Sequence, residues 1–327
     1  MSIVAVDNLA GGGRRIPVLA IAIAAYVAVA AVIAPNDFSD MCLQYLHQAI
    51  ILPPVLLVGL CMASLIRRPR APVSFIIDVL RDRLLWLILV VAIFCVGMAA
   101  FTTIKIAIPH LVPFYADRWL ADIDGLLVPG GPGLLAHALV PGWAAYSLAF
   151  LYGPIWFLGW FGLLGFVALN GDKRLRGRYF WSMALLLCVV GTVLAVLLSS
   201  VGPVFYDRIY ASDRFGDLMQ LLANSSVGSY MHDETAYLYD NYVSNGHGMG
   251  TGISAMPSVH IAVVTLNAWM LSSLNRWVGA VAWGYVAAIV LGSVYLGWHY
   301  LADGAVSLFA VSLIWWLTGR FSAIKAR

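Results

Sequence analysis

The sequence predicts an all-α fold, a polytopic bundle of about eight membrane-spanning helices. Of the 327 residues, 62% are hydrophobic and only 11% are charged, whereas a soluble domain carries about 25% charged residues. So few charges could not cover a surface in water. The apolar residues also gather in runs that are long enough to cross a bilayer. The chain is therefore expected to be an integral membrane protein.

Eight apolar runs are expected to form the spans, since about 20 apolar residues suffice for one crossing. These runs cover residues 16–34, 49–66, 84–104, 146–169, 180–201, 260–274, 277–298 and 300–319. The first run follows two arginines, as the apolar part of a signal peptide would, but its length favours a span that is retained.

The basic residues predict the orientation of the bundle. If the N-terminus is cytoplasmic, all but four of the 19 Lys and Arg residues fall on the cytoplasmic side. The four on the other side are Lys105, Arg118, Arg208 and Arg214. Because cytoplasmic loops carry an excess of Lys and Arg, both termini are predicted to be cytoplasmic. The net charge of only +3, in short clusters, argues against a nucleic-acid partner.

Three connections are expected on the non-cytoplasmic side. Residues 35–48 show a weak amphipathic pattern. Within 105–145, Tyr115, Trp119, Ile123 and Leu126 recur at helical spacing, which predicts a helix lying in the membrane interface. The longest connection, 202–259, is polar and rich in tyrosine. A connection of this length is usually a functional lid or disordered, and its place directly before His260 favours a lid.

Two histidines are predicted to meet at the non-cytoplasmic face. His260 opens the sixth span there, and the seventh span returns from Arg276 to bring His299 to the same face. Ser258 is a candidate N-cap of the sixth span. His260 would then lie in the first helical turn, where free N–H groups favour an anion such as phosphate. Taken alone, this motif also suits a polar cap with a histidine in interfacial water.

Asp303 follows His299 by four residues, so one helical turn would place both on one face. The carboxylate could then hold one ring nitrogen and leave the other free to attack an electrophile. A structural His–Asp pair is the alternative. Two histidines and one carboxylate give weak support for zinc, and the four cysteines match neither a disulfide framework nor a metal spacing. No metal or cofactor is expected.

These residues also carry a resemblance. Residues 254–260 read Ser-Ala-Met-Pro-Ser-Val-His, and 295–303 read Tyr-Leu-Gly-Trp-His-Tyr-Leu-Ala-Asp. Together they resemble the last two signature motifs of the type-2 phosphatidic acid phosphatase superfamily, and more narrowly its inositol phosphorylceramide synthase-like branch. Residues 101–117 and 202–206 are looser matches. The resemblance implies that His299 becomes a phosphohistidine, that Asp303 orients it, and that His260 protonates the leaving oxygen.

Two arginines of the phosphatase motifs are missing. No Lys-x6-Arg-Pro sequence occurs, and Ser293 stands where an arginine precedes the nucleophilic histidine. Transition-state charge still needs cations or dipoles, so Lys105 and Arg208, each next to a span end, are the favoured replacements. Ser258 and Tyr206 complete the expected phosphate-binding set. The synthase branch also lacks the arginine pair, which favours head-group transfer over hydrolysis.

The sequence thus predicts a membrane enzyme that moves a phosphorylated head group between lipids at the non-cytoplasmic face. One alternative is a lipid phosphate or isoprenoid diphosphate phosphatase that uses water as the acceptor. Another is a transporter or binding protein, although transporters place such groups at mid-membrane. We expect a single domain, 1–327, with accessory spans at about 16–66 and a catalytic core at about 84–319.

The expected partners are the bilayer and its lipids, and nothing in the sequence indicates an oligomeric state. Small size and the lack of long tails favour a bacterial inner membrane, with the site facing the periplasm or exterior.

Overall fold

All regular structure in the described part of the chain is helical, as the sequence predicts. The computed structural model describes residues 15–169, 172–248 and 250–323. Six helical segments there are long and apolar enough to cross a membrane: Pro35–Leu65, Pro72–Leu111, Gly142–Leu169, Lys173–Leu197, Arg276–Tyr295 and Leu301–Arg320. The shorter apolar helices Val18–Ile33 and Val259–Leu274 fall on the first and sixth expected spans. The chain is a polytopic helical bundle.

The N-terminal part comprises α2 (Arg15–Ile33), α3 (Pro35–Gln48), α4 (Leu52–Arg67) and α5 (Pro72–Leu111). The stretch expected as a weakly amphipathic connection is the full helix α3, which packs against α5. The 40 residues of α5 rise by about 60 Å, against about 30 Å for the hydrocarbon core. For this reason α5 extends past the expected span at both ends.

The central part contains two helical segments that are interrupted by π-helical turns. In the first, α8 (Ala145–Phe150) continues through the π-turn η3 (Leu151–Ile155) into α9 (Trp156–Leu169). Pro154 lies inside η3, and a proline lacks the N–H that the α-helical ladder needs. The second runs from α10 (Lys173–Leu185) through η4 (Leu186–Leu194) into α11 (Ala195–Leu197). Turns of this kind within α-helices are frequent at functional sites.

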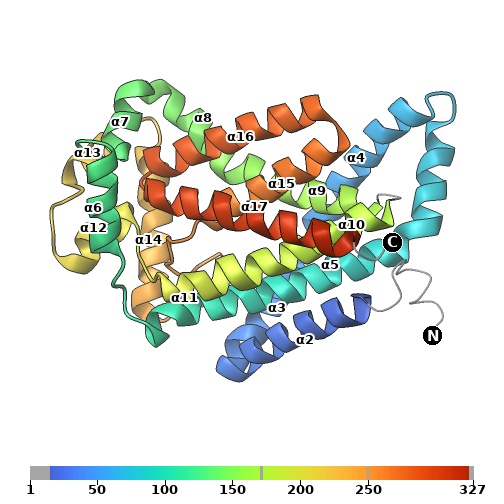
Figure 1. Ribbon diagram of the computed structural model, residues 1–327, viewed down its shortest axis with the longest axis horizontal. Coiled ribbons are helices and arrows are strands. Elements are labelled where there is room, and N and C mark those ends of the chain that lie inside the picture. The colour runs from blue at the N-terminus through green and yellow to red at the C-terminus, as the bar shows by residue number, and fades with distance from the viewer. Residues whose placement is uncertain (1–14, 170–171, 249, 324–327) are drawn as a thin grey trace.

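The C-terminal part is formed by α15 (Val259–Leu274), α16 (Arg276–Tyr295) and α17 (Leu301–Ala323). Asn275 turns the chain between the first two, because its side-chain oxygen caps α16 by accepting hydrogen bonds from two backbone N–H groups, at 2.8 and 3.3 Å. Helix α15 packs against both α16 and α17 and is buried over residues 261–268. The termini themselves, 1–14 and 324–327, lie outside the described residues. Helix α2 begins and α17 ends at the same end of the bundle (Figure 1).

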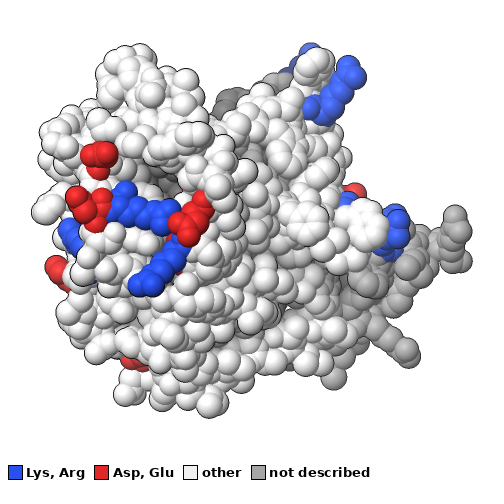
Figure 2. Space-filling view, turned by 60° about the vertical axis from the view of Figure 1, so that its left-hand side comes forward, with Lys and Arg blue, Asp and Glu red and all other residues white. Residues whose placement is uncertain are grey.

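Short helices cover the opposite end of the bundle (Figure 1): α6 (Asp117–Leu127), α7 (Pro132–Leu139), α12 (Pro203–Tyr210), α13 (Gly216–Ala223) and α14 (Gly228–Ser244). The last three make the expected lid segment mostly helical. Helix α6 has the predicted amphipathic form, since Trp119, Ile123 and Leu126 are exposed while Leu120 is buried. Figure 2 shows basic and acidic side chains gathered on this end within an otherwise uncharged surface.

Candidate active site

His299 lies in a tight turn between α16 and α17. The Ser293 carbonyl accepts hydrogen bonds from the N–H groups of Trp298 at 3.0 Å and His299 at 3.3 Å. Gly297 has a φ of +72°, which glycine adopts without a steric penalty. Its carbonyl accepts a hydrogen bond from the N–H of Val204 at 2.9 Å. The histidine is therefore carried on a turn just ahead of α17, and not within a helix as its spacing from Asp303 had suggested.

His299 and Asp303 nevertheless form the expected pair. His299 Nδ1 is 3.1 Å from Asp303 Oδ2, which also accepts a hydrogen bond from the N–H of Tyr300 at 3.1 Å. Asp303 is fully buried and His299 is 7% exposed. A carboxylate beside Nδ1 favours the tautomer with its proton there, which leaves the Nε2 lone pair free. The His299 ring is thus oriented by the start of the next helix.

His260 faces His299, with the two ring centroids 6.5 Å apart. It lies in the first turn of α15, where the fully buried Ser258 is the N-cap as predicted, its hydroxyl accepting a backbone hydrogen bond at 3.4 Å. The ring stacks on Tyr152 at a centroid distance of 4.3 Å and lies against Trp156 at 4.2 Å. The Trp156 Nε1–H also donates to the His260 carbonyl at 3.0 Å.

Sequence reasoning did not single out Tyr152 and Trp156. They flank Gly153 and Pro154 in the π-turn η3 and at the start of α9. The glycine and the proline inside an apolar span could have pointed to this place in the sequence, because such a pair marks a break in the helical hydrogen-bond ladder. The break places the two aromatic rings against one histidine.

The three other expected phosphate-binding residues differ in their exposure and in their neighbours. Lys105, on α5, packs against Gly252 in the loop that leads to α15. Arg208 is exposed with its guanidinium over the Tyr239 ring, and within the described ranges no hydrogen bond or ion pair joins it to either histidine. Tyr206 is buried against Tyr210 in a small aromatic cluster. Phosphate contact by these residues stays a prediction.

Two buried carboxylates of α6 hold the turn that carries His299, and sequence reasoning missed both. Asp117 accepts a hydrogen bond from the Tyr300 hydroxyl at 2.9 Å and another from the Tyr210 hydroxyl at 3.1 Å. It also accepts bonds from the N–H groups of Val201 and Gly202, each at 3.0 Å. Burial raises the pKa of the Asp117 carboxyl, while these hydrogen bonds oppose the rise.

Asp124 performs a similar task two helical turns along α6. Its carboxylate accepts hydrogen bonds from the N–H groups of Leu301 at 2.8 Å and Ala302 at 3.4 Å, at the start of α17. Burial raises the pKa of this carboxyl too. The spacing of seven residues from Asp117 puts both on one helical face. In the sequence, this spacing could have identified the two carboxylates, because it places both on the side of α6 opposite its exposed apolar face.

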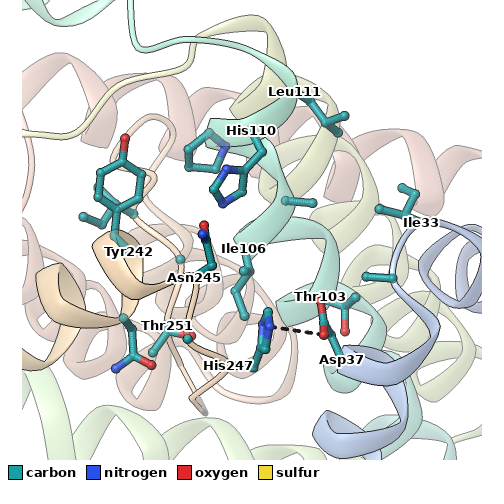
Figure 3. A pocket seen from close by; sticks show the side chains of 17 residues that line it. Ile33, Asp37, Thr103, Ile106, His110, Leu111, Tyr242, Asn245, His247 and Thr251 are labelled. Carbon is teal, nitrogen blue, oxygen red and sulfur yellow. Dashed lines mark ion pairs between the residues drawn. The ribbon is translucent and has the colours of Figure 1, made fainter.

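A groove of about 320 Å³ lies between α2, α3, α5, α14 and the loop after α14. In Figure 3, His110 and Asn245 point toward one another across it. His247 Nε2 is 3.2 Å from Asp37 Oδ1, which joins α3 to the loop that leads to α15. The wall includes Gly252, which packs against Lys105. Helix α3 is thereby connected to the segment that leads to His260.

Among the residues described, no group of three or more His, Cys, Asp or Glu side chains is arranged to hold a metal ion. The reactive groups that the structure brings together are two imidazoles and one buried carboxylate. This set can supply a nucleophile and a proton donor at a single place.

The family model described as the PAP2 superfamily matches residues 118–317. The match covers more than half of the chain and includes both histidines and Asp303, whereas Lys105 and Asp117 lie just before it. It supports the superfamily and not any branch within it. Comparisons with curated proteins and with solved structures give no match. The chain therefore belongs to the PAP2 superfamily and is a lipid phosphatase or phosphotransferase.

Proposed function

We propose that the enzyme transfers a phosphorylated head group between lipids through a phosphohistidine on His299. The observation that carries the proposal is the facing pair of imidazoles, 6.5 Å apart between centroids, with Asp303 on Nδ1 of one of them. A phosphorus atom and its leaving oxygen can bridge such a gap, since reacting atoms need to approach to about 3–3.5 Å.

In the first half-reaction, His299 Nε2 attacks phosphorus and forms an N–P bond while the P–O bond to the donor lipid breaks. His260 gives its proton to the leaving oxygen, and Asp303 stabilises the positive charge that develops on His299. In the second half-reaction, His260 takes the proton of an acceptor hydroxyl. That oxygen then attacks phosphorus and the N–P bond breaks, which restores His299.

Positive charge and dipoles near the phosphoryl oxygens support this chemistry. Lys105, which packs against Gly252 in the loop before α15, is the proposed source of positive charge, and His260 itself lies at the N-terminus of α15, where the helix dipole favours an anion. Such preorganised groups are usually the largest contribution to transition-state stabilisation. The asymmetry of the basic residues supports the proposed orientation, in which the site faces the periplasm or exterior.

The test uses the full chain in proteoliposomes with ³²P-labelled phosphatidylinositol or phosphatidic acid as donors. We expect an acid-labile, base-stable label on the wild-type enzyme and none on His299→Ala. His260→Ala and Asp303→Asn should lower turnover by about 10²- to 10⁴-fold. The exposed His232 provides the control His232→Ala, which should behave as wild type.

The fate of the label separates transfer from hydrolysis. Label that passes to an added lipid alcohol supports the phosphotransferase, and label released only as inorganic phosphate means that water is the acceptor and the enzyme is a phosphatase. Near-normal turnover by His299→Ala would refute the phosphohistidine route altogether.

A further inference from the structure

The turn that carries His299 is tied to the end of α16 through the Ser293 carbonyl, which accepts the Trp298 and His299 N–H groups. It joins two helices, and the first N–H groups of α17 have no acceptor within that helix. Asp303 belongs to the first turn of α17, whereas His299 precedes the helix by two residues. The placement of the imidazole relative to its carboxylate therefore depends on what holds the start of α17.

We infer that Asp117 and Asp124 of α6 are positioning residues, which together hold residues 297–302 so that His299 Nε2 is aimed at the substrate phosphorus. This inference rests on the proposed function, because it takes His299 as the nucleophile. Neither carboxylate touches the substrate in this scheme. Asp124 acts through the backbone N–H groups of Leu301 and Ala302, and Asp117 acts through the side chain of Tyr300.

Asp124 holds the turn on its C-terminal side. Its two oxygens take the N–H groups of Leu301 and Ala302, so a carboxylate from α6 caps α17 across a tertiary contact. A cap on its own helix would fix only that helix, whereas this cap also fixes the distance between α6 and α17. Loss of a helix cap typically loosens the first turn, and Asp303 lies in that turn.

Asp117 holds both flanks of His299. On one side it binds the hydroxyl of Tyr300, the next residue along the chain. On the other side it binds the N–H of Gly202. Gly202 lies so close to the turn that a Cβ there would come within 2.5 Å of the Trp298 carbonyl oxygen. The residues before and after His299 are in this way tied to one carboxylate.

Packing alone does not explain two carboxylates at these positions. Asp117 is fully buried and Asp124 is 5% exposed, and burying a charge is costly unless it is well hydrogen-bonded. Apolar side chains would join α6 to the bundle without that cost. Both carboxylates lie on the same face of α6, and each is bonded to the same short turn.

The test compares Asp117→Asn and Asp124→Asn, which keep the shape of the side chain but remove one acceptor oxygen, with Asp122→Asn. Asp122 lies on the same helix but is 66% exposed and pairs with Arg214 at the surface. We expect kcat to fall about 10- to 100-fold in the two buried variants. The KM for ³²P-labelled phosphatidylinositol should stay within about twofold, and Asp122→Asn should be unchanged.

A double-variant measurement separates positioning from a general structural role. In a His299→Ala background, residual turnover is measured with added imidazole as an external nucleophile. Asp124→Asn should have no further effect there, because the residue it positions is gone. An equal loss in both backgrounds, or an unchanged kcat in the His299 enzyme, overturns the inference.

If either aspartate variant fails to fold, Tyr300→Phe replaces it in the test. It removes only the hydroxyl bonded to Asp117, and we expect a several-fold lower kcat with unchanged KM. An unchanged kcat in this variant overturns the part of the inference that concerns Asp117. If His299→Ala alone keeps wild-type turnover, the proposed function fails as well, so the two failures are distinguishable.

Discussion

His260 is held by groups outside its own helix. Tyr152 and Trp156 lie against its ring, and the Trp156 indole N–H binds its backbone carbonyl. An imidazole held on its face and at its backbone has few other orientations. This restriction suits the proton-donor role that we propose for His260, because misplacement of a reacting group is costly.

We predict that Trp156→Phe lowers kcat about five- to tenfold. The change keeps an aromatic ring but removes one hydrogen bond, worth about 1 kcal/mol, and a tenfold change in rate corresponds to about 1.4 kcal/mol. The control is Trp160→Phe, one turn further along α9, because the buried Trp160 Nε1 has no hydrogen-bond partner within the described part of the chain. Equal losses in the two variants would contradict the prediction.

His137 gives a prediction about pH. Its ring stacks on Tyr295 at 3.8 Å, and its Nε2 lies 3.0 Å from the Tyr295 carbonyl oxygen. Burial lowers the pKa of His137 below 6.5, and this effect outweighs the hydrogen bond, which raises the pKa. The folded state therefore binds the proton less tightly than the unfolded chain. The free energy of unfolding should fall as the pH drops below 6.5.

The measurement is Tm in detergent between about pH 7 and 5, compared with His137→Gln, which cannot titrate in this range. The variant should lose part of the acid sensitivity. The control is the exposed His232→Gln, which should follow the wild type. A pH dependence that is identical in His137→Gln and the wild type would be the contrary result.

At the scale of elements, the site is a meeting of two turns. The turn of residues 296–300 packs against the turn before α12, through Gly202 and the Val204 N–H. Gly202 combines a φ of +84° with close approach to the Trp298 carbonyl. Glycine is needed there for both reasons, since any Cβ would be strained and would also collide.

We predict that Gly202→Ala costs about 2–4 kcal/mol of unfolding free energy and lowers kcat, because the clash displaces the residue before His299. Gly130→Ala is the matched control. Gly130 has a nearly identical φ of +83°, but a Cβ there would meet nothing within 4 Å. It should cost only about 1 kcal/mol and keep full kcat. Similar results for the two variants would show that close packing of the turns is unimportant.

At the scale of the whole molecule, the site and the basic residues that are predicted to be cytoplasmic lie at opposite ends of the helical bundle. Helices α6, α12, α13 and α14 cover the end at which His299 lies, and α2 begins and α17 ends at the other (Figure 1). The positive-inside rule then predicts that α6 lies outside the cytoplasm. A lipid head group would enter the site from that surface.

Cysteine labelling checks this topology. In a cysteine-free background, Asp122→Cys on α6 should react with a membrane-impermeant maleimide in intact cells. Arg276→Cys, at the start of α16, should react only after permeabilisation. Both positions are solvent-exposed, so access and not burial decides the outcome. The opposite pattern would invert the orientation, and with it the side at which the site faces.

The sequence by itself predicts the helical membrane fold, the shared face of His260 and His299, and the N-cap at Ser258. Hydropathy, charge asymmetry and capping are local properties, which a single stretch of chain carries without its neighbours. The identity of the superfamily follows for the same reason, since its two motifs are short and continuous. The division into accessory spans and a catalytic core stays a prediction.

Only the tertiary structure shows that His299 stands outside α17, that Tyr152 and Trp156 lie against His260, and that α6 carries two carboxylates to the turn that holds His299. It also places the Arg208 guanidinium over the Tyr239 ring. These features arise between segments up to about 180 residues apart. Hydrogen bonds and ring contacts at such separations depend on how the helices pack, which no local pattern encodes.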